Sequence, residues 1–142
     1  MTAPVVELQG LSRRFDGHPP VDAVRDVDLT IERGEYVAIV GRSGSGKSTL
    51  LHLLGLLDRP TKGTYLLDGI STDGIDDRRR AQLRAERIGF VFQSFHLVSH
   101  TSVLDNVMLG GLYTGRGARE RREIAERMVT RVGLSERCTA RP

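Results

Sequence analysis

Apolar and polar residues alternate in several short segments of the chain, a pattern typical of strands that bury one face. Residues 5–11 alternate weakly and residues 24–31 alternate cleanly, so we expect strands in both, the second half-buried and antiparallel. Another short strand is expected at 63–69, between two turns. The runs 36–40 and 88–92 are nearly continuous in apolar residues, which predicts parallel strands that are buried on both faces.

Helical patterns lie between and after these strands. A helix is expected from near residue 47 to an end at 55–58, before Pro60, and others over 76–87, 101–107 and 118–132. The last of these has an apolar face and is followed by Gly133, which suits a helix C-cap. The apolar face comprises Ile124, Met128, Val129 and Val132. Strands that alternate with helices in this way predict an α/β fold.

The most informative segment joins the run 36–40 to the helix after it. Residues 41–49 fit G-x-x-x-x-G-K-[ST], the phosphate-binding loop, whose glycines let backbone N–H groups surround the α- and β-phosphates at the positive end of a helix. Lys47 would supply charge to the β- and γ-phosphates, Ser48 is the expected Mg²⁺ ligand, and Thr49 can add a hydroxyl or N–H group. The expected nucleotide-binding set is Gly41, Arg42, Ser43, Gly44, Ser45, Gly46, Lys47, Ser48 and Thr49. The alternative, a glycine-rich turn that caps an ordinary helix, is disfavoured by the flanking strand and helix.

Composition and charge restrict the partners and the compartment. The net charge of +3 is modest, and the run at 78–80 is typical of a solvated helix face, so we expect no nucleic-acid partner. Cys138 is the only cysteine, which excludes an internal disulfide and fits a reducing compartment. The chain begins with no signal-peptide pattern, and its longest apolar run, at 50–57, is too short to span a bilayer. We therefore expect a soluble, cytosolic protein that needs a partner for any role at the membrane.

Residues 37–50, together with the strand 88–93 that ends in Gln93, resemble the nucleotide-binding domain of ABC transporters. The resemblance runs from residue 5 to residue 142. Within this family the chain is similar to the branch that includes the MacB macrolide exporter, the LolD lipoprotein-release ATPase and FtsE. This finer similarity is carried by residues 56–61, 92–97 and 105–107.

The resemblance implies a P-loop NTPase fold of the ABC type, with an N-terminal antiparallel β subdomain, a partial parallel core sheet and the start of a helical subdomain. Residues 1–142 would be the N-terminal part of one nucleotide-binding domain, with the core at 1–93 and the start of the helical subdomain at 94–142. Residues 94–101 would dock a transmembrane permease subunit and hold the domain on the inner face of the cell membrane. In the complete protein a second nucleotide-binding domain would form a dimer with it. The candidate contacts with the permease are Phe95, His96, Leu97 and His100.

The resemblance also implies roles for single residues toward ATP and Mg²⁺. Phe15 lies where the family places an aromatic ring that stacks on adenine, although it could instead be a small core residue beside a turn. Ala23 and Val24 would form an apolar wall beneath the nucleotide, and ordinary core packing explains them equally well. Gln93 would reach Mg²⁺ and the attacking water, the alternative being a polar residue at a strand end. The implied catalytic residues are Lys47 and Gln93, and the implied metal ligands are Ser48 and Gln93.

Other motifs of the family do not occur among the 142 residues: an L-S-G-G-Q segment, an apolar strand ending in Asp-Glu, and a switch histidine. The resemblance places the signature segment a few residues beyond Pro142, so we expect a truncated chain with no meaningful ATP turnover by itself. Two central strands that it implies between 36–40 and 88–92 are missing as well. We therefore expect open strand edges and a marginal or aggregation-prone fold.

Two functions remain open from the sequence. One is an ATP-binding subunit that couples ATP binding and hydrolysis to export or lipoprotein release, and the other is a catalytically inactive nucleotide-binding remnant. A different P-loop enzyme is disfavoured because the chain has no N-K-x-D segment for guanine. An ABC ATPase of DNA repair is disfavoured by residues 93–107 and by the weak basic character.

Overall fold

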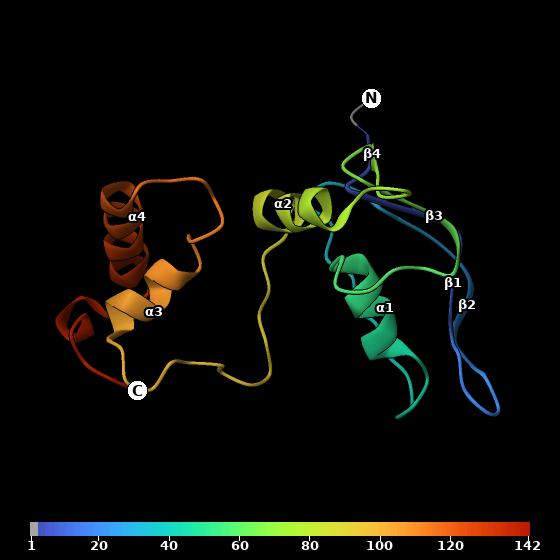
Figure 1. Cartoon of the computed structure of the whole chain (residues 1–142), viewed down its shortest axis with the longest axis horizontal. Helices are drawn as coiled ribbons and strands as arrows, with labels where there is room; N and C mark the ends of the chain where they lie inside the picture. Colours follow the sequence, from blue (N-terminus) through green and yellow to red (C-terminus); the bar gives the residue numbers. More distant parts are fainter. Residues whose placement is uncertain (1–2) are drawn as a thin grey trace. The chain divides into compact units, whose positions relative to one another are not determined.

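The computed structural model describes residues 3–142. The chain forms two compact units, Met1–Arg84 and Ala85–Pro142, which run from blue to green-yellow and from yellow to red in Figure 1. The expected division between a core at 1–93 and a helical subdomain from residue 94 stays a prediction about the layout of the whole domain. Within the described residues, no helix combines the length and the apolar character that crossing a membrane requires.

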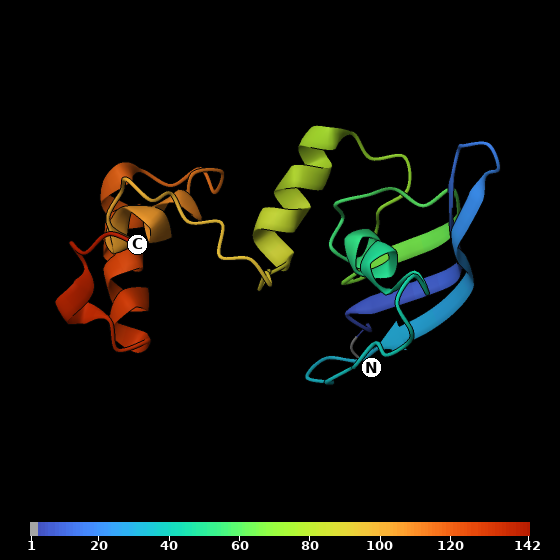
Figure 2. The same cartoon turned by 90° about the horizontal axis from the view of Figure 1, so that it is seen from below.

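The first unit is built on a four-stranded antiparallel sheet with the strand order β2-β1-β3-β4. Val6 lies opposite Ile31 on one side and Leu67 on the other, so the first strand sets the register of both its neighbours. The two strands expected from alternation and the short strand expected between two turns are confirmed, and Figure 2 shows the three side by side. The strands are β1 (Val6–Phe15), β2 (Val21–Ile31), β3 (Lys62–Leu67) and β4 (Ile70–Ser71).

The core of this unit forms between the sheet and α1 (Lys47–Leu54), the helix expected after the glycine loop. Leu11 of β1, Leu53 of α1 and Tyr65 of β3 are almost completely buried. The Tyr65 hydroxyl donates a hydrogen bond of 2.8 Å to the Leu54 carbonyl, which joins β3 to the end of α1. Burial raises the pKa of Tyr65 to about 12, because the phenolate is poorly solvated there. Helix α1 is therefore fixed against the sheet, and the loop that leads into its first residue is attached to a rigid element.

Helix α2 (Asp77–Arg87) agrees with the helix expected at 76–87. Its Arg80 is buried, and the Arg80 Nη1 atom donates to the Asp58 carbonyl at 2.7 Å. Arg84 likewise donates from Nη1 to the Leu56 carbonyl at 2.8 Å. Burial lowers the pKa of Arg80 from its ordinary value. The expectation of a solvated face at 78–80 is thus wrong for Arg80, whose guanidinium satisfies a backbone carbonyl of the segment after α1.

The two buried parallel strands expected at 36–40 and 88–92 are not formed. Both segments are irregular, with Tyr36 94 % exposed and Val91 fully exposed. A strand exists only where a neighbour completes its ladder of hydrogen bonds, and the sheet of residues 3–142 consists of β1 to β4 alone. The expected partial parallel core sheet is therefore absent from the described residues, while the antiparallel β subdomain is present. Apolar character alone predicted the strands wrongly because it does not report whether a pairing strand exists.

The second unit is a small helical cluster, and both helices expected in it, near 101–107 and 118–132, are formed. Leu104, Ala125 and Val129 are buried together in its core. The Leu104 N–H group donates to the Cys138 carbonyl at 3.0 Å, so the last segment of the chain returns to the start of the first helix. The elements are α3 (Val103–Leu109), α4 (Ala118–Arg131) and the 3-10 turn η1 (Ser135–Arg137).

The buried face of α4 differs from the expected one by a few residues. Val129 is buried as expected, but Met128 and Val132 are exposed and Ala125 takes the second core position. Gly133, directly after the helix, adopts a left-handed backbone with φ 73°, as the expected cap requires. Ala125 was missed because a small side chain adds little to an apolar pattern, although its spacing of four residues from Val129 places both on one face.

Candidate phosphate-binding site

The loop at 41–46 ends at the first residue of α1, whose N-terminal boundary is unusual. The N-cap position is Gly46, which has no side chain to accept hydrogen bonds from the first backbone N–H groups. The first turn of α1 also holds no acidic residue. The positive end of the helix dipole is therefore not offset by a carboxylate of its own first turn. This arrangement suits an external anion, since a helix N-terminus binds phosphate through such N–H groups.

Gly46 also lies directly against the sheet. Its backbone has φ 88°, in the left-handed region that favours glycine, and a Cβ built there would overlap the carbonyl oxygen of Ala23 on β2. Any side chain at this position would push the start of α1 away from β2. The glycine therefore fixes where the helix N-terminus lies relative to the sheet.

Lys47, the first residue of α1, folds its side chain back over the loop. Its Nζ atom donates to the Arg42 carbonyl at 2.5 Å and lies 3.4 Å from Ser45 Oγ. The Ser45 N–H group in turn donates to the same Arg42 carbonyl at 3.2 Å, which closes the turn. The ammonium group thus lies within the curve of the loop, where an anion would meet both the charge and the backbone N–H groups.

The other members of the predicted set follow the same loop and helix start. Ser48, the predicted Mg²⁺ ligand, is exposed on the first turn of α1, and Thr49 beside it is half-buried. Among the described residues, no group of three His, Cys, Asp or Glu side chains could hold a metal ion. A metal at this site would therefore depend on a hydroxyl and on phosphate oxygens, a donor set that suits Mg²⁺. The remaining loop residues, all exposed, are Gly41, Arg42, Ser43, Gly44 and Ser45.

A hollow of about 370 Å³ lies beside the loop, within the range of small-ligand sites. Ala23 and Val24 of β2 line it together with Lys47, so the predicted apolar wall and the loop face the same space. Val24 is buried, and it therefore serves the core as well as this wall. The complete lining is Asp22, Ala23, Val24, Arg25, Val27, Ile39, Val40, Ser45, Gly46, Lys47 and Leu50.

One carboxylate, that of Asp22, lines this hollow and would repel an anionic ligand if it were unpaired. Arg25 Nη2 lies 3.4 Å from Asp22 Oδ2, and Arg14 Nη1 lies 3.7 Å from Asp22 Oδ1. Two guanidinium groups therefore offset its charge, and the hollow can accept a phosphate chain next to Lys47.

Phe15 ends β1 and is 40 % exposed, so it is not fully packed into the core. The Arg13 guanidinium carbon lies 4.4 Å from the centroid of the Phe15 ring, a cation–π contact on the ring face. This contact of Arg13 with Phe15 was not predicted from the sequence, although residues two apart on a strand share a face. The stacking of adenine on Phe15 stays a prediction.

Gln93 belongs to the second unit, where it is exposed in an irregular segment. In the same segment Phe90 and Phe92 stack with ring centroids 5.5 Å apart, and His96 meets Phe92 edge-on at 5.6 Å. Phe95 is exposed. The predicted reach of Gln93 to Mg²⁺ and the attacking water stays a prediction.

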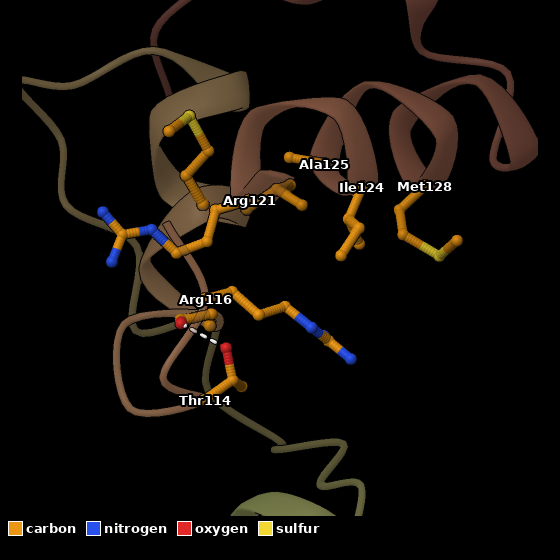
Figure 3. Close-up of a pocket in the computed structure, with 10 residues that line it drawn as sticks. Thr114, Arg116, Arg121, Ile124, Ala125 and Met128 are labelled. Atoms are coloured by element: carbon orange, nitrogen blue, oxygen red, sulfur yellow. Dashed lines mark hydrogen bonds between the residues drawn. The ribbon is translucent and has the colours of Figure 1, made fainter. Parts of the chain in front are cut away.

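A second hollow, of about 170 Å³, lies between α3 and α4 in the second unit (Figure 3). Ile124 and Met128 line it together with Arg116 and Arg121. The two guanidinium groups extend in opposite directions in Figure 3, so they do not converge on one ligand. Arg116 pairs with Glu120 at 3.1 Å. The hollow therefore offers apolar surface without a focused polar group, unlike the space beside Lys47.

Comparison with known proteins places these features in a family. The family model described as "ABC transporter" matches residues 24–142. The macrolide export ATP-binding/permease protein MacB of Shewanella sp. strain W3-18-1 is 46 % identical over 143 residues, and MacB 1 of Yersinia pestis is 47 % identical over 141 residues. These alignments cover 100 % and 99 % of this chain but 22 % of each relative, so the chain spans about a fifth of their length.

Solved structures give the same result for the fold. The dimeric ATP-binding cassette MJ0796 in a post-hydrolysis state with ADP and Pi matches with a TM-score of 0.83 and 37 % identity. That match covers 96 % of this chain and 61 % of the cassette. Another dimeric structure of MJ0796 matches with a TM-score of 0.81 and 38 % identity over 94 % of this chain and 60 % of that one. The glycine loop, the family match and the shared backbone path agree: the chain belongs to the ABC transporter family, as an ATP-binding domain with the P-loop fold of ABC cassettes.

Proposed function

We propose that residues 41–49 bind the triphosphate of Mg·ATP and that the chain serves as the ATP-binding subunit of a transporter. The observation that carries this proposal is the Lys47 ammonium, which lies within the loop at a helix N-terminus without a side-chain cap. An arriving phosphate would replace the Arg42 carbonyl as the partner of Lys47 and accept hydrogen bonds from the loop backbone.

The chain's own residues divide the work of binding. The backbone from Gly41 to Gly46 surrounds the α- and β-phosphates, Lys47 reaches the β- and γ-phosphates, and Ser48 donates a hydroxyl oxygen to Mg²⁺. A bound Mg²⁺ would neutralise charge on the phosphate oxygens. By resemblance to the family, Gln93 would contact this metal and orient the attacking water in the assembled transporter.

The adenine ring of ATP would lie on the apolar side of the site. Phe15 keeps enough exposed ring surface to stack on adenine, and Ala23 and Val24 bound the hollow beside Lys47. Stacking and apolar contact hold a nucleobase without reading its hydrogen-bonding edge, so this side of the site would give affinity for the base with little choice among bases.

The membrane role is proposed by similarity. Relatives named macrolide export ATP-binding/permease proteins support a permease partner. We propose that this partner docks at residues 94–101 and holds the domain on the inner face of the cell membrane. Phe95 and Leu97 present exposed apolar surface in this segment. Solved cassettes described as dimeric support pairing with a second nucleotide-binding domain. We propose that ATP binding and hydrolysis in the assembled transporter drive export or lipoprotein release.

Residues 1–142 by themselves are proposed to bind ATP without turning it over. They hold the phosphate loop and Gln93 but no L-S-G-G-Q segment and no apolar strand ending in Asp-Glu. A positioned base contributes roughly 10²–10⁴-fold to rate in such reactions. Lys47-dependent ATP hydrolysis by the purified chain would contradict this, and its absence would equally suit a catalytically inactive nucleotide-binding protein.

The test of ATP binding is a titration with Mg·ATP followed by calorimetry. Lys47→Ala removes a charge-assisted bond worth roughly 1.5–3 kcal/mol, so the dissociation constant is expected to rise about 10- to 100-fold. Lys62→Ala is the matched control, because Lys62 is exposed on β3 and is the only other lysine of the chain. Equal affinity of the Lys47→Ala variant and the unsubstituted chain would overturn the proposal.

A further inference from the structure

The side-chain amide of Asn106, in α3, makes an unusual set of contacts with the chain that precedes its helix. Asn106 Oδ1 accepts a hydrogen bond of 2.8 Å from the Val98 N–H group. Asn106 Nδ2 lies within hydrogen-bond distance of three acceptors, Thr101 Oγ1 at 2.8 Å, the Ser102 carbonyl at 3.0 Å and the Val98 carbonyl at 3.1 Å, which share its two hydrogens. One half-buried side chain thus bonds both backbone groups of Val98.

The orientation of this amide follows from its partners. A backbone N–H group can only donate, so the oxygen of Asn106 must face Val98 N, which leaves the NH₂ group for the acceptors around it. Thr101 reinforces the contact, because its hydroxyl donates to the Val98 carbonyl at 3.0 Å and its N–H group does so at 3.2 Å. Residues 98–102 are therefore closed into a turn around a single amide.

This turn follows directly after the exposed apolar residues of the proposed docking segment. Phe95 is 88 % exposed and Leu97 is 54 % exposed, and the backbone of His96 between them is left-handed with φ 49°. The side chain at 95 is almost fully exposed and that at 97 is about half exposed, so side-chain packing fixes this segment only weakly and the backbone after it provides the firmer hold. Its anchor in the structure is Val98, held at both its N–H and its carbonyl by Asn106.

We infer that Asn106 is a positioning residue that fixes Val98 and thereby presents Phe95 and Leu97 to the membrane partner. The inference rests on the proposed docking role of residues 94–101 and adds a residue that does not itself lie in that segment. Leucine at 106 has a similar volume but can neither donate nor accept. Aspartate can still accept from Val98 but cannot donate.

Backbone hydrogen exchange of the full chain tests the contact itself. In Asn106→Leu the Val98 amide is expected to exchange about three- to tenfold faster, the change that loss of one hydrogen bond produces. Asn106→Asp is expected to restore part of the protection, because a carboxylate accepts the same N–H group. Val107→Ala, the next residue of α3, is the control and is expected to leave Val98 unchanged. Unaltered exchange at Val98 in Asn106→Leu would overturn the inference.

Cross-linking in cells of the source organism tests the consequence. A benzophenone side chain placed at position 95 is expected to link the chain to an integral membrane polypeptide, with a yield at least threefold lower in Asn106→Leu and unchanged in Val107→Ala. An unchanged yield despite faster exchange at Val98 would show a purely structural contact and overturn the positioning role. Without any such link in the unsubstituted chain, the docking proposal fails and takes the inference with it. Titration with Mg·ATP, expected to be equal in all variants, reports on the phosphate site separately.

Discussion

Replacing Gly46 by alanine tests the close approach between the loop and the sheet. The alanine would have to keep φ at 88°, which costs a non-glycine residue about 1–2 kcal/mol. Its Cβ would also overlap the Ala23 carbonyl oxygen, a backbone atom of β2 that cannot rotate away. Relief requires the start of α1 to move off the sheet, at a further cost of roughly 1–3 kcal/mol. The total is about 2–5 kcal/mol. Because binding of Mg·ATP requires the loop in its native position, this cost opposes binding and is expected to weaken it at least about 30-fold.

Variants at two other glycines separate the cost of a left-handed backbone from the cost of steric overlap by the Cβ atom. Gly44 has φ 78° and Gly34 has φ 83°, and in neither case would a Cβ meet any atom within 4 Å. Gly44→Ala should therefore incur only the backbone cost of about 1–2 kcal/mol within the loop. Gly34→Ala should incur the same cost outside it and leave the affinity for Mg·ATP unchanged.

The assay is calorimetric titration of each variant with Mg·ATP, alongside urea unfolding to record stability. Gly46→Ala is expected to show the largest loss of affinity, Gly44→Ala a smaller one and Gly34→Ala none. Far-UV circular dichroism distinguishes a local shift of α1 from global unfolding. Equal affinities of the Gly46→Ala and Gly44→Ala variants would refute the reasoning, because they would mean that contact with the Ala23 carbonyl does not position the loop.

Two further predictions concern the fold. The raised pKa of Tyr65 means that its contribution to stability is complete below about pH 10 and is lost as the pH rises to about 12, a change of roughly 2–3 kcal/mol. Tyr65→Phe, which removes the bond to the Leu54 carbonyl, should flatten this alkaline limb in urea unfolding; an unchanged limb would contradict the assignment. Val40 and Val91 are 86 % and 102 % exposed, so Val40→Thr and Val91→Thr should reduce light scattering by the purified chain without lowering its melting temperature. Val129→Thr, in the core, should lower the melting temperature. If Val40→Thr and Val91→Thr scatter as much light as the unsubstituted chain, Val40 and Val91 are excluded as the cause of the scattering.

Much of the local structure could be predicted from residues close together in the chain. The alternation that predicted β1 and β2 was correct because an antiparallel sheet with one buried face imposes a period of two on each strand, and the turns on either side of β3 predicted that strand. The glycines before Lys47 and the apolar residues after it predicted a loop that leads into a helix. The spacing of residues within a motif determines local structure directly, so these predictions did not depend on how distant parts of the chain pack.

Other features depended on residues far apart. The segment at 36–40 has the composition of a buried strand, yet most of its side chains are exposed because no strand of the described residues pairs with it. Arg80, in a run that looked solvated, is buried because the Asp58 carbonyl needs a donor at that place. Neither outcome can be deduced from the neighbours of these residues in sequence.

The phosphate-binding motif, its helix and the antiparallel strands were determined by the sequence alone, since each follows from local spacing and turn chemistry. The tertiary structure decided that Gly46 lies against the Ala23 carbonyl, that Lys47 folds back to Arg42 and that Asn106 encloses the turn at 98–102. The physical reason is that hydrogen bonds and steric contacts act between atoms a few ångströms apart. The folded backbone sets those distances, and the pattern of residues along the chain does not.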